Sequence, residues 1–447
     1  MMSSQKAMSH LSLKALSTTA LLTLTLGASG CSSLAADAPS SNGSDVALMQ
    51  EVMRQVEQSY VVPVKPGQLV DGALKGMLTR LDPHSDYMTE REYRELVTTT
   101  TGQFGGVGIE ISVENGVPQV VAAIEGTPAS GAGIEPGDRI VKADGQAIVG
   151  MDIGDVVRRL RGAPGTRVML TIARASRPLF EVPITRAVIH VDSVKQALKP
   201  GGIGYVRITT FDENTPTELR AAIAHLRQQA GGSLSGFILD LRNDAGGLLD
   251  AAVEVSADFL DSGTVVTTRG READENRVYE APPNGDLLRK VPVVVLINGA
   301  SASASEIVAG ALQDNHRATV LGTHSFGKGS VQSIIPIEGH GALRLTTSLY
   351  YTPSGRSIQG YGITPDRVVD VPKEQQVANA VITYEKDLFG AIKAPGSIGP
   401  KAAPAPAAQT VAGETDHPMN PKTIGTPQDG QLNAAVDFLA GRRAAAR

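Results

Sequence analysis

The chain has 447 residues, with 41 lysines and arginines against 46 aspartates and glutamates, and therefore a formal net charge of −5. This length predicts two or three domains with ample core, and the mildly acidic balance argues against a nucleic-acid-binding protein. The single cysteine, Cys31, excludes an intrachain disulfide framework and any zinc site built from several cysteines. The composition therefore indicates a multidomain globular chain.

Residues 1–30 have the pattern of a secretory signal peptide. Early positive charge at Lys6 and Lys14 precedes an apolar run at 15–27 and a group of small residues. The run is too short to span a bilayer as a helix. The tetrapeptide Ala-Ser-Gly-Cys ending at Cys31 resembles a bacterial lipobox, although alanine replaces the usual leucine. We favour lipidation of Cys31 over an ordinary cleavage site, and we expect residues 31–44, rich in Ser, Ala, Asp and Gly, to form a flexible tether.

Residues 45–101 predict two or three amphipathic helices, interrupted by a turn at 63–67. The two apolar stripes consist of Met49, Val52, Met53 and Val56, and of Val70, Ala73, Leu74, Met77 and Leu81. Helices with so little core of their own must pack on another part of the chain or on a second subunit.

From 102 to 186 the pattern changes to short strands, turns and one helix. The segment GQFGGVGIEISV, a Pro-Gly-Asp turn before RIVKADGQAI, and a helix at 151–162 follow one another. This order resembles a PDZ domain, which binds a peptide as an added strand and captures its terminal carboxylate on a Gly-rich loop. The resemblance implies a substrate-binding loop at Gly105, Gly106, Val107, Gly108 and Ile109. A simple turn is the alternative interpretation of these glycines.

Alternating strands and helices dominate residues 187–371. Strands are predicted at 204–209, 237–241 and 291–298, and helices at 216–230 and 248–260. This order indicates an α/β layer with parallel strands. Residues 271–286 are polar and predict a surface loop. No supporting His or Glu pattern accompanies Asp240, Asp244 and Asp250, so we predict no metal site.

The segment 300–330 carries the candidate chemistry. A β-branched strand ends just before it, and Ala304, Ile307, Val308 and Ala311 then recur at helical spacing. Ser303 is therefore predicted at a strand-to-helix turn, where unpaired backbone N–H groups favour developing negative charge. Taken alone, serines at a helix start are more often simple caps.

Four segments in this region favour a nucleophilic serine over a simple helix cap, namely LRNDAGGLLD, NGASASASEIVAGALQD, FGKGSVQ and YYTPSGRSIQGYGITPD. They closely resemble the carboxyl-terminal processing peptidases, or tail-specific proteases, of serine peptidase family S41, and with weaker matches they cover most of 46–371. By this resemblance Ser303 is the nucleophile, Lys328 the general base and Gln332 the residue that positions the lysine. The oxyanion hole would use the N–H groups of Ala304 and of Gly246 or Gly247.

The resemblance also implies a fold and a domain order. We expect an α/β multidomain chain: an N-terminal helical segment, then a PDZ-like β-rich domain inserted before an α/β protease core of the ClpP/crotonase-like type. The expected boundaries are 1–30 signal peptide, 31–44 tether, 45–101 helical region, 102–186 PDZ domain, 187–371 protease core and 372–447 C-terminal linker and helix. One departure is that Asp-Ala-Gly-Gly at 244–247 replaces the usual Asn-Pro-Gly-Gly. Arg161 resembles a family arginine that senses substrate, with an exposed, solvated arginine as the alternative.

A lysine acts as a base near neutral pH only when its pKa, ordinarily about 10.4, is lowered by removal from water. Lowering this pKa by about three units corresponds to about 4 kcal/mol. The segment GTHSFGKG at 322–329 nearly matches a phosphate-binding P-loop, but Gly329 replaces the hydroxyl residue and a strand rather than a helix follows. His316 and His324 lie in no recognisable hydrolase context.

The C-terminal part carries less information. Residues 375–392 predict a helix, 393–430 a Pro- and Ala-rich disordered linker, and 432–445 a short closing helix. We found no motif in this part.

Together these observations predict a serine endopeptidase of the bacterial cell envelope that faces the periplasm and needs no cofactor. Its partners would be protein or peptide substrates with free C-termini, a second subunit in a homo-oligomer such as a dimer, a possible activating adaptor, and the membrane if Cys31 is lipidated. The main alternative is a peptide-binding adaptor with an inactive protease core. A carrier of small apolar ligands on a related fold would not need the Ser303 and Lys328 pair.

Overall fold

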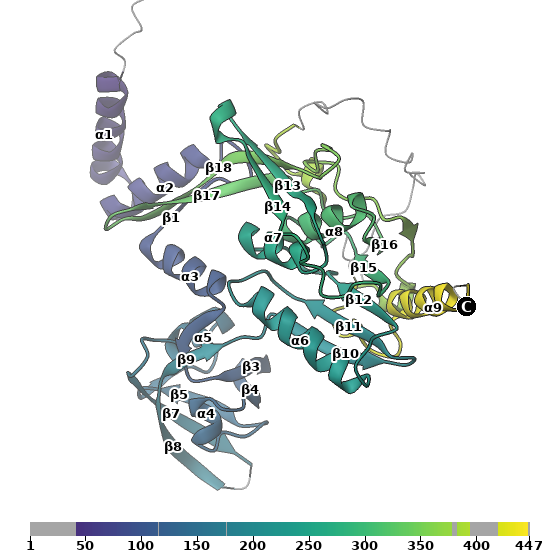
Figure 1. Cartoon of the computed structure of the whole chain (residues 1–447). Helices are drawn as coiled ribbons and strands as arrows, with labels where there is room; N and C mark the ends of the chain where they lie inside the picture. Colours follow the sequence, from purple (N-terminus) through teal and green to yellow (C-terminus); the bar gives the residue numbers. More distant parts are fainter. Residues whose placement is uncertain (1–41, 115, 176, 378–381, 394–418, 446–447) are drawn as a thin grey trace, which may run out of the picture. The chain divides into compact units, whose positions relative to one another are not determined.

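The computed structural model describes residues 42–114, 116–175, 177–377, 382–393 and 419–445 (Figure 1). The chain divides into two compact units, residues 1–66 and 67–447. The described part of the first unit is dominated by helix α1 (Asn42–Ser59). Val46, Met49 and Val52 on this helix are each more than half exposed, so its apolar stripe is presented to solvent.

The second unit begins with elements that lead into the protease core. These are α2 (Pro66–Leu78), β1 (Asp86–Met88) and α3 (Glu90–Thr100). Thr89 and Glu92 form a capping box at the start of α3, and Lys75 of α2 forms an ion pair with Glu92 at 2.6 Å. The predicted helices are present, but the sequence did not predict β1, which is only three residues long.

A six-stranded antiparallel sheet follows, in which five strands have the order β3-β4-β5-β7-β8 and β6 pairs with β5. A core of its own, with Ile140, Leu170 and Ile172 fully buried, holds this PDZ-like region together. A separate pair, β2 with β9, lies at its two ends in the sequence. The strands are β2 (Gln103–Gly106), β3 (Ile109–Glu114), β4 (Val117–Ala123), β5 (Arg139–Ala143), β6 (Gln146–Ala147), β7 (Arg167–Arg174), β8 (Arg177–Thr185) and β9 (Ala187–His190), and the helices are α4 (Pro128–Gly131) and α5 (Ile153–Leu160).

A six-stranded sheet forms the centre of the protease core, in the order β10-β11-β12-β15-β16-β19. All neighbours run parallel except β10, which is antiparallel to β11. The parallel α/β layer predicted from the sequence is therefore confirmed. The strands are β10 (Val194–Lys199), β11 (Ile203–Ile208), β12 (Gly236–Asp240), β15 (Val293–Ile297), β16 (Ala318–Gly322) and β19 (Arg367–Val368).

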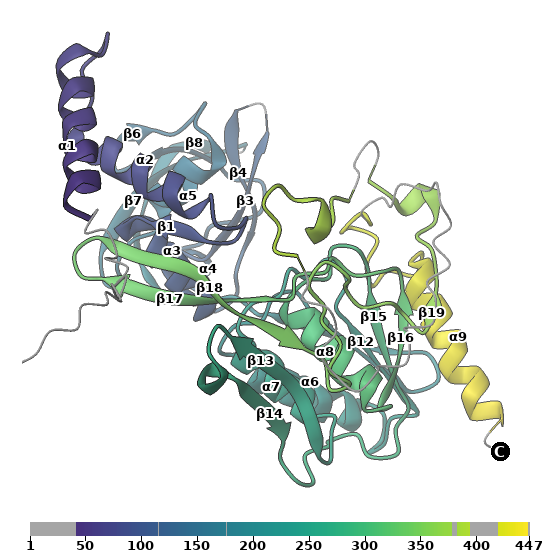
Figure 2. The same ribbon diagram turned by 90° about the horizontal axis from the view of Figure 1, so that it is seen from above.

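Helices cover both faces of this sheet, as Figure 2 shows for α8 and α9. Because side chains alternate along a strand, Leu239 and Val295 join the core under α6, α7 and α8, whereas Ile238 and Val294 join the core under α9. Burial on both sides explains why these strands read as continuous apolar runs. The helices are α6 (Thr215–Gln229), α7 (Leu249–Ala257), α8 (Ala304–Asp314) and α9 (Gly430–Ala445).

A second sheet in the protease core contains a long hairpin, β17 (Ser330–Ile337) with β18 (Gly341–Tyr351). Strand β18 also pairs with β1 and with β13 (Gly263–Gly270), which in turn pairs with β14 (Arg277–Ala281). The prediction of a surface loop at 271–286 was therefore wrong in part, because β14 and the 3₁₀ turn η1 (Ala273–Glu275) lie within it.

The C-terminal segment differs from its prediction. In the described part of 375–392 there is no α-helix, only the 3₁₀ turns η2 (Lys373–Gln375) and η3 (Glu385–Asp387). The predicted linker ends earlier than expected, because Met419 and Asp429 are fully buried in turns that precede α9. The rest of that linker, 394–418, lies outside the described residues. The closing helix is confirmed by α9.

A buried ionic cluster fastens this C-terminal segment to the end of β12. The fully buried Arg242 guanidinium donates to Asp240 at 2.6 Å and to Asp429 at 2.6 Å. Burial alone would raise the pKa of Asp429, but the bonds from Arg242 outweigh it and lower that pKa. The two carboxylates share one buried cation, and removal of Asp429 would leave the buried N–H groups that it accepts without their charged acceptor.

Replacing Asp429 by alanine should therefore destabilise the protein strongly. Loss of one partner from a buried ion pair typically costs about 3–5 kcal/mol, whereas loss of an exposed pair costs about 0–1 kcal/mol. The free energy of unfolding from urea denaturation checks this. The matched control is Asp261→Ala, which removes the exposed partner of Arg289. Equal, small losses of unfolding free energy in both variants would show that the buried ionic cluster does not stabilise the fold.

Candidate functional site

Ser303 occupies a strained backbone position between β15 and α8. Its φ of 56° and ψ of −114° form a conformation that side chains disfavour and glycine normally supplies. The flanking serines brace this turn against the loop after β12: the Ser301 hydroxyl donates to the Leu241 carbonyl at 2.7 Å, and the Ser305 hydroxyl donates to the Asp244 carbonyl at 3.2 Å. Strain of this kind, held by its surroundings, is typical of functional sites.

The Glu306 carboxylate joins this turn to the loop that carries Lys328. Glu306 lies in the first turn of α8 and is fully buried. Its Oε2 accepts the backbone N–H of Ser303 at 2.8 Å and that of Lys328 at 2.9 Å, so one oxygen holds both residues side by side. Its Oε1 accepts the Gly327 N–H at 2.7 Å and the Ser325 hydroxyl at 2.5 Å. Burial raises the pKa of Glu306 to about 7, and the four donors oppose this rise.

Lys328 and Gln332 are in direct contact. The lysine Nζ donates to Gln332 Oε1 at 2.6 Å, and the lysine is only partly exposed. Removal from water lowers the pKa of Lys328, and the positive charge of Arg344 lowers it further. Three nearby carboxylates act in the opposite direction, namely Glu385, Glu306 and Asp82. Since the net pKa lies below its ordinary value, more of the lysine is the neutral amine that can accept a proton.

The predicted oxyanion residues surround the Ser303 turn. A Cβ on Gly246 would lie 2.8 Å from the Ala304 nitrogen and 2.9 Å from the Ser303 Cβ, so only glycine fits there. The Gly246 N–H donates to Asp244 Oδ1 at 2.8 Å. By contrast, the N–H groups of Gly247 and Ala304 have no acceptor within the described residues. Gly246 thus supplies space, and Gly247 and Ala304 supply the free donors.

Asp244, where the resembled family usually has asparagine, lies directly beneath this turn. It is fully buried, and its Oδ2 has no hydrogen-bond partner within the described part of the chain. Burial raises the pKa of Asp244 to about 7, against the opposing effect of the Gly246 N–H. A neutral carboxyl group is therefore favoured there below neutral pH.

Two further residues of the site were missed by the sequence analysis. Glu306 stands three residues after Ser303, the spacing of a capping box, and this signal could have identified it. Tyr350 on β18 had no such signal. Its phenol oxygen is buried and has no hydrogen-bond partner within the described residues. Burial raises the pKa of this phenol and the negative charge of Glu306 raises it further, whereas the Ser303 hydroxyl lowers it.

The predicted peptide-binding loop lies at an open sheet edge. Among the described strands, β3 pairs with β4 alone, so its other side could accept a further strand. Gly105 and Gly106 belong to β2, and Gly108 has a φ of +79° with Thr127 too close for any side chain. Of the two apolar residues, Val107 is buried in the PDZ-like core and Ile109 packs against that core.

Arg161 caps the C-terminal end of α5, and its guanidinium lies 4.4 Å above the Phe104 ring. The guanidinium is thereby held in a cation–π contact with the strand that leads into the Gly-rich loop. Cys31, the signal peptide and nearly all of the tether lie outside the described residues.

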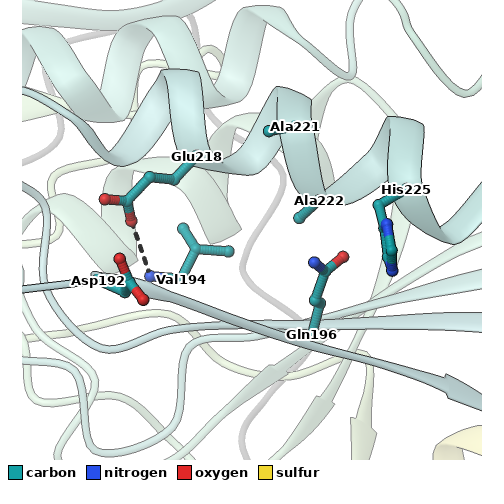
Figure 3. A pocket seen from close by; sticks show the side chains of 7 residues that line it. All are labelled: Asp192, Val194, Gln196, Glu218, Ala221, Ala222 and His225. Carbon is teal, nitrogen blue, oxygen red and sulfur yellow. Dashed lines mark hydrogen bonds between the residues drawn. The ribbon is translucent and has the colours of Figure 1, made fainter. Parts of the chain in front are cut away.

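A hollow of about 400 Å³ between β10 and α6 lies apart from these groups (Figure 3). Its only acidic group on the helix is Glu218, whose Oε2 accepts the N–H and hydroxyl of Ser193 at 2.8 Å and the N–H of Val194 at 3.1 Å. This carboxylate is therefore occupied in holding the edge strand β10.

The strain at Ser303 predicts a difference between two variants. Ser303→Gly removes the steric cost of the positive φ, whereas Ser303→Ala keeps it, so the glycine variant should be more stable by about 1 kcal/mol. Thermal unfolding of both variants and of the wild type checks this. The strained backbone would be contradicted if Ser303→Ala were the more stable of the two.

Asp244 predicts a pH effect on stability. Its pKa is raised in the folded state, so the unfolded chain loses this proton first as the pH rises. Wild type should therefore lose stability between about pH 4 and pH 7, relative to Asp244→Asn, whose side chain does not titrate. The melting temperatures of both proteins across this range provide the measurement. Parallel curves would rule out a buried, protonated Asp244.

Comparison with known proteins places these features in one family. The model of peptidase family S41 matches residues 202–369, a PDZ domain model matches 119–174, and the model of the activating protease CtpB N-terminal domain matches 27–92. The photosystem II D1 C-terminal processing protease, a solved structure, is 30% identical, with 73% of this chain and 93% of that one covered and a TM-score of 0.43.

Two curated relatives have closely related names. A carboxy-terminal-processing protease of Bartonella bacilliformis is 47% identical over 347 residues, which are 77% of this chain and 79% of that protein. The carboxy-terminal processing protease CtpA of Bacillus subtilis is 33% identical over 351 residues, or 78% and 74% of the two chains. With this identity over most of both sequences, the chain belongs to peptidase family S41 and is a carboxy-terminal processing protease with a PDZ domain.

Proposed function

We propose that this peptidase cleaves envelope proteins near their C-terminal ends with a Ser-Lys dyad, Ser303 as nucleophile and Lys328 as general base. Lys328 Nζ takes the hydroxyl proton as Ser303 Oγ attacks the scissile carbonyl, and it then delivers that proton to the leaving amine. In deacylation Lys328 accepts a proton from the attacking water and returns it to the Ser303 oxygen as that oxygen leaves. The N–H groups of Gly247 and Ala304 stabilise the tetrahedral oxyanion.

The observation that carries this proposal is the shared hydrogen-bond acceptor. Glu306 Oε2 binds the backbone N–H of both Ser303 and Lys328, which fixes nucleophile and base on one rigid support. Gln332 then holds the lysine amine through a neutral amide oxygen. A carboxylate in the place of this amide would raise the lysine pKa, whereas the amide orients the amine without adding charge.

Selection of substrate belongs to the PDZ-like region in this proposal. The open edge of β3 receives a peptide as an added strand, and the loop Gly105–Gly108 captures its terminal carboxylate on backbone N–H groups. Arg161, stacked on Phe104 beside this loop, responds to the bound peptide. The names of the relatives, which are processing proteases that act at carboxyl termini, agree with such a substrate class.

Export to the cell envelope, a lipid anchor on Cys31 and assembly into a homodimer complete the proposal. Their support is the signal-peptide pattern, the lipobox-like residues and the exposed apolar stripe of α1. No helix in the described residues is long and apolar enough to cross a membrane. The alternative of an inactive adaptor is disfavoured, since the site keeps a hydroxyl, a lysine of lowered pKa and free oxyanion donors.

Loss of either dyad member should abolish cleavage while peptide binding persists. We expect Ser303→Ala and Lys328→Ala to reduce kcat/KM by at least ~10⁴-fold, because nucleophile and base act as one unit. The substrate is an unfolded protein with a free apolar C-terminus, and mass spectrometry follows its fragments. Wild-type activity should rise with pH through the lysine pKa and reach its plateau below the pH that an ordinary lysine would require.

A PDZ-loop variant, Gly108→Val, serves as the control for binding: Thr127 leaves no room for its side chain, so it should disrupt the Gly-rich loop and weaken peptide capture while the dyad residues stay unchanged. Cleavage by purified Ser303→Ala would refute the assignment of the nucleophile. If wild type and both variants bind the peptide and none cleaves it, the adaptor hypothesis prevails.

A further inference from the structure

The side chain that holds the lysine is itself held by a series of hydrogen bonds. Gln332 Nε2 donates to Thr346 Oγ1 at 3.1 Å and to Ser330 Oγ at 3.0 Å. Thr346 Oγ1 in turn donates to Asp82 Oδ1 at 3.1 Å. The series therefore runs from Lys328 through Gln332 and Thr346 to Asp82, a residue that precedes the PDZ-like region in the sequence.

The last bond of the series, from Thr346 to Asp82, determines which group donates in the other bonds. Asp82 is almost fully buried and accepts the N–H groups of His84 and Ser85, both at 2.8 Å, and the Ser85 hydroxyl at 2.7 Å. Burial raises the pKa of Asp82, but these bonds and the Thr346 hydroxyl outweigh it and lower the pKa, so the group is a carboxylate. A carboxylate only accepts hydrogen bonds. The Thr346 hydroxyl must therefore donate to it.

With its proton directed to Asp82, the Thr346 oxygen presents a lone pair to Gln332. The amide group of Gln332 must then turn its NH₂ towards Thr346, which leaves Oε1 facing the amine of Lys328. The opposite orientation would turn Oε1 towards the Thr346 oxygen, whose proton is already donated to Asp82. It would also direct an NH₂ group at the lone pair of the neutral amine, which must accept the proton of Ser303. The ionised Asp82 thus determines which way the Gln332 amide points.

We propose that Asp82 and Thr346 are positioning residues for the Lys328 base: they fix the Gln332 amide, and this amide aims the lysine lone pair at Ser303. The inference rests on the proposed dyad and deepens it. When Gln332 Oε1 accepts one N–H of the neutral amine, the orientation of the remaining lone pair is restricted. Because Asp82 acts through two neutral groups, it directs the lysine without forming the ion pair that would keep it protonated.

A second series of bonds connects the same short segment to the loop of Lys328. His84 Nε2 lies 2.8 Å from Glu385 Oε2, and Glu385 Oε1 accepts an N–H of Gln359 at 2.8 Å. Gln359 Oε1 accepts the backbone N–H of Gly329, the residue after Lys328, at 2.9 Å. Through these two series, segment 82–85 supports both the Gln332 side chain that binds the lysine and the backbone of Gly329 next to it.

The pairing of β1 with β18 explains how this segment reaches the site. Asp86 is in register with Arg344 on β18, two residues before Thr346, and the Thr346 N–H donates to the Ser85 hydroxyl at 3.1 Å. Segment 82–85 lies outside residues 202–369, the part matched by the peptidase family model. On this inference the peptidase core is not sufficient for catalysis, because a residue ahead of the PDZ-like region completes the support of its base.

The test compares Thr346→Val, which has nearly the same shape but no hydroxyl, with Thr346→Ser, which keeps the hydroxyl, in the full-length chain. We expect Thr346→Val and Asp82→Ala to lower kcat roughly 10- to 100-fold with KM nearly unchanged, because the lysine is misaligned rather than the substrate displaced. Thr346→Ser should keep kcat within about threefold of wild type. The double variant should be no worse than Thr346→Val alone, since both changes break one series.

The matched control is Thr347→Val on the same strand, whose hydroxyl bonds only to Ser333, at 2.7 Å, among the described residues. It should leave kcat unchanged. A fluorophosphonate probe, which phosphonylates the active serine as fluoride leaves, gives a second readout, and its reaction with Ser303 should slow by the same factor in Thr346→Val. Melting temperatures are measured for all variants, and if Asp82→Ala fails to fold, the kcat of Thr346→Val alone tests the proposal.

Wild-type kcat in Thr346→Val, with Ser303→Ala and Lys328→Ala inactive, would overturn the positioning role and leave the dyad intact. Equal losses in Thr346→Ser and Thr346→Val would also overturn it, because the hydroxyl would then not matter. Activity that survives in Lys328→Ala would instead refute the proposed dyad itself.

Discussion

The site depends above all on one buried carboxylate, that of Glu306. Its four donors come from the start of α8 and from the loop before β17, so this one side chain joins the two segments. A carboxylate buried without such donors would be costly, and donors so close together would repel one another without a carboxylate between them. The carboxylate and its four donors therefore stabilise each other, and together they determine where Ser303 lies relative to Lys328.

The sheet brings the remaining parts of the site together. Strands β12 and β15 are parallel neighbours, so their carboxyl ends lie at the same edge, and the loops that leave them carry Gly246 and Ser303. The close approach of these loops is possible because Gly246 lacks a side chain. Behind the sheet, α9 and the Arg242 cluster fix the end of β12 from the other face. Both faces of the sheet thus contribute to the position of one loop.

Sequence alone predicted the elements whose pattern is local. The parallel strands appear as apolar runs, and α6, α7 and α8 appear as periodic stripes, because burial by the sheet imposes these patterns directly. What it missed depends on partners distant in the chain. Strand β1 has only three residues and exists by pairing with β18, and the buried segment before α9 is held by Asp429 reaching Arg242. No short-range spacing encodes either contact, so periodicity could not reveal them.

Some buried polar groups have no hydrogen-bond partner within the described residues, and their position in the protein is informative. Buried polar atoms normally find partners, yet within the described residues the Tyr350 phenol has no hydrogen-bond partner, and the N–H groups of Gly247 and Ala304 at the Ser303 turn have no acceptor. Together with the positive φ of Ser303, these features lower the stability of the folded protein at one place. A tetrahedral intermediate with a negatively charged oxygen would satisfy such donors better than the resting enzyme does. Binding energy is then realised in the transition state rather than in the ground state, which is the condition for catalysis.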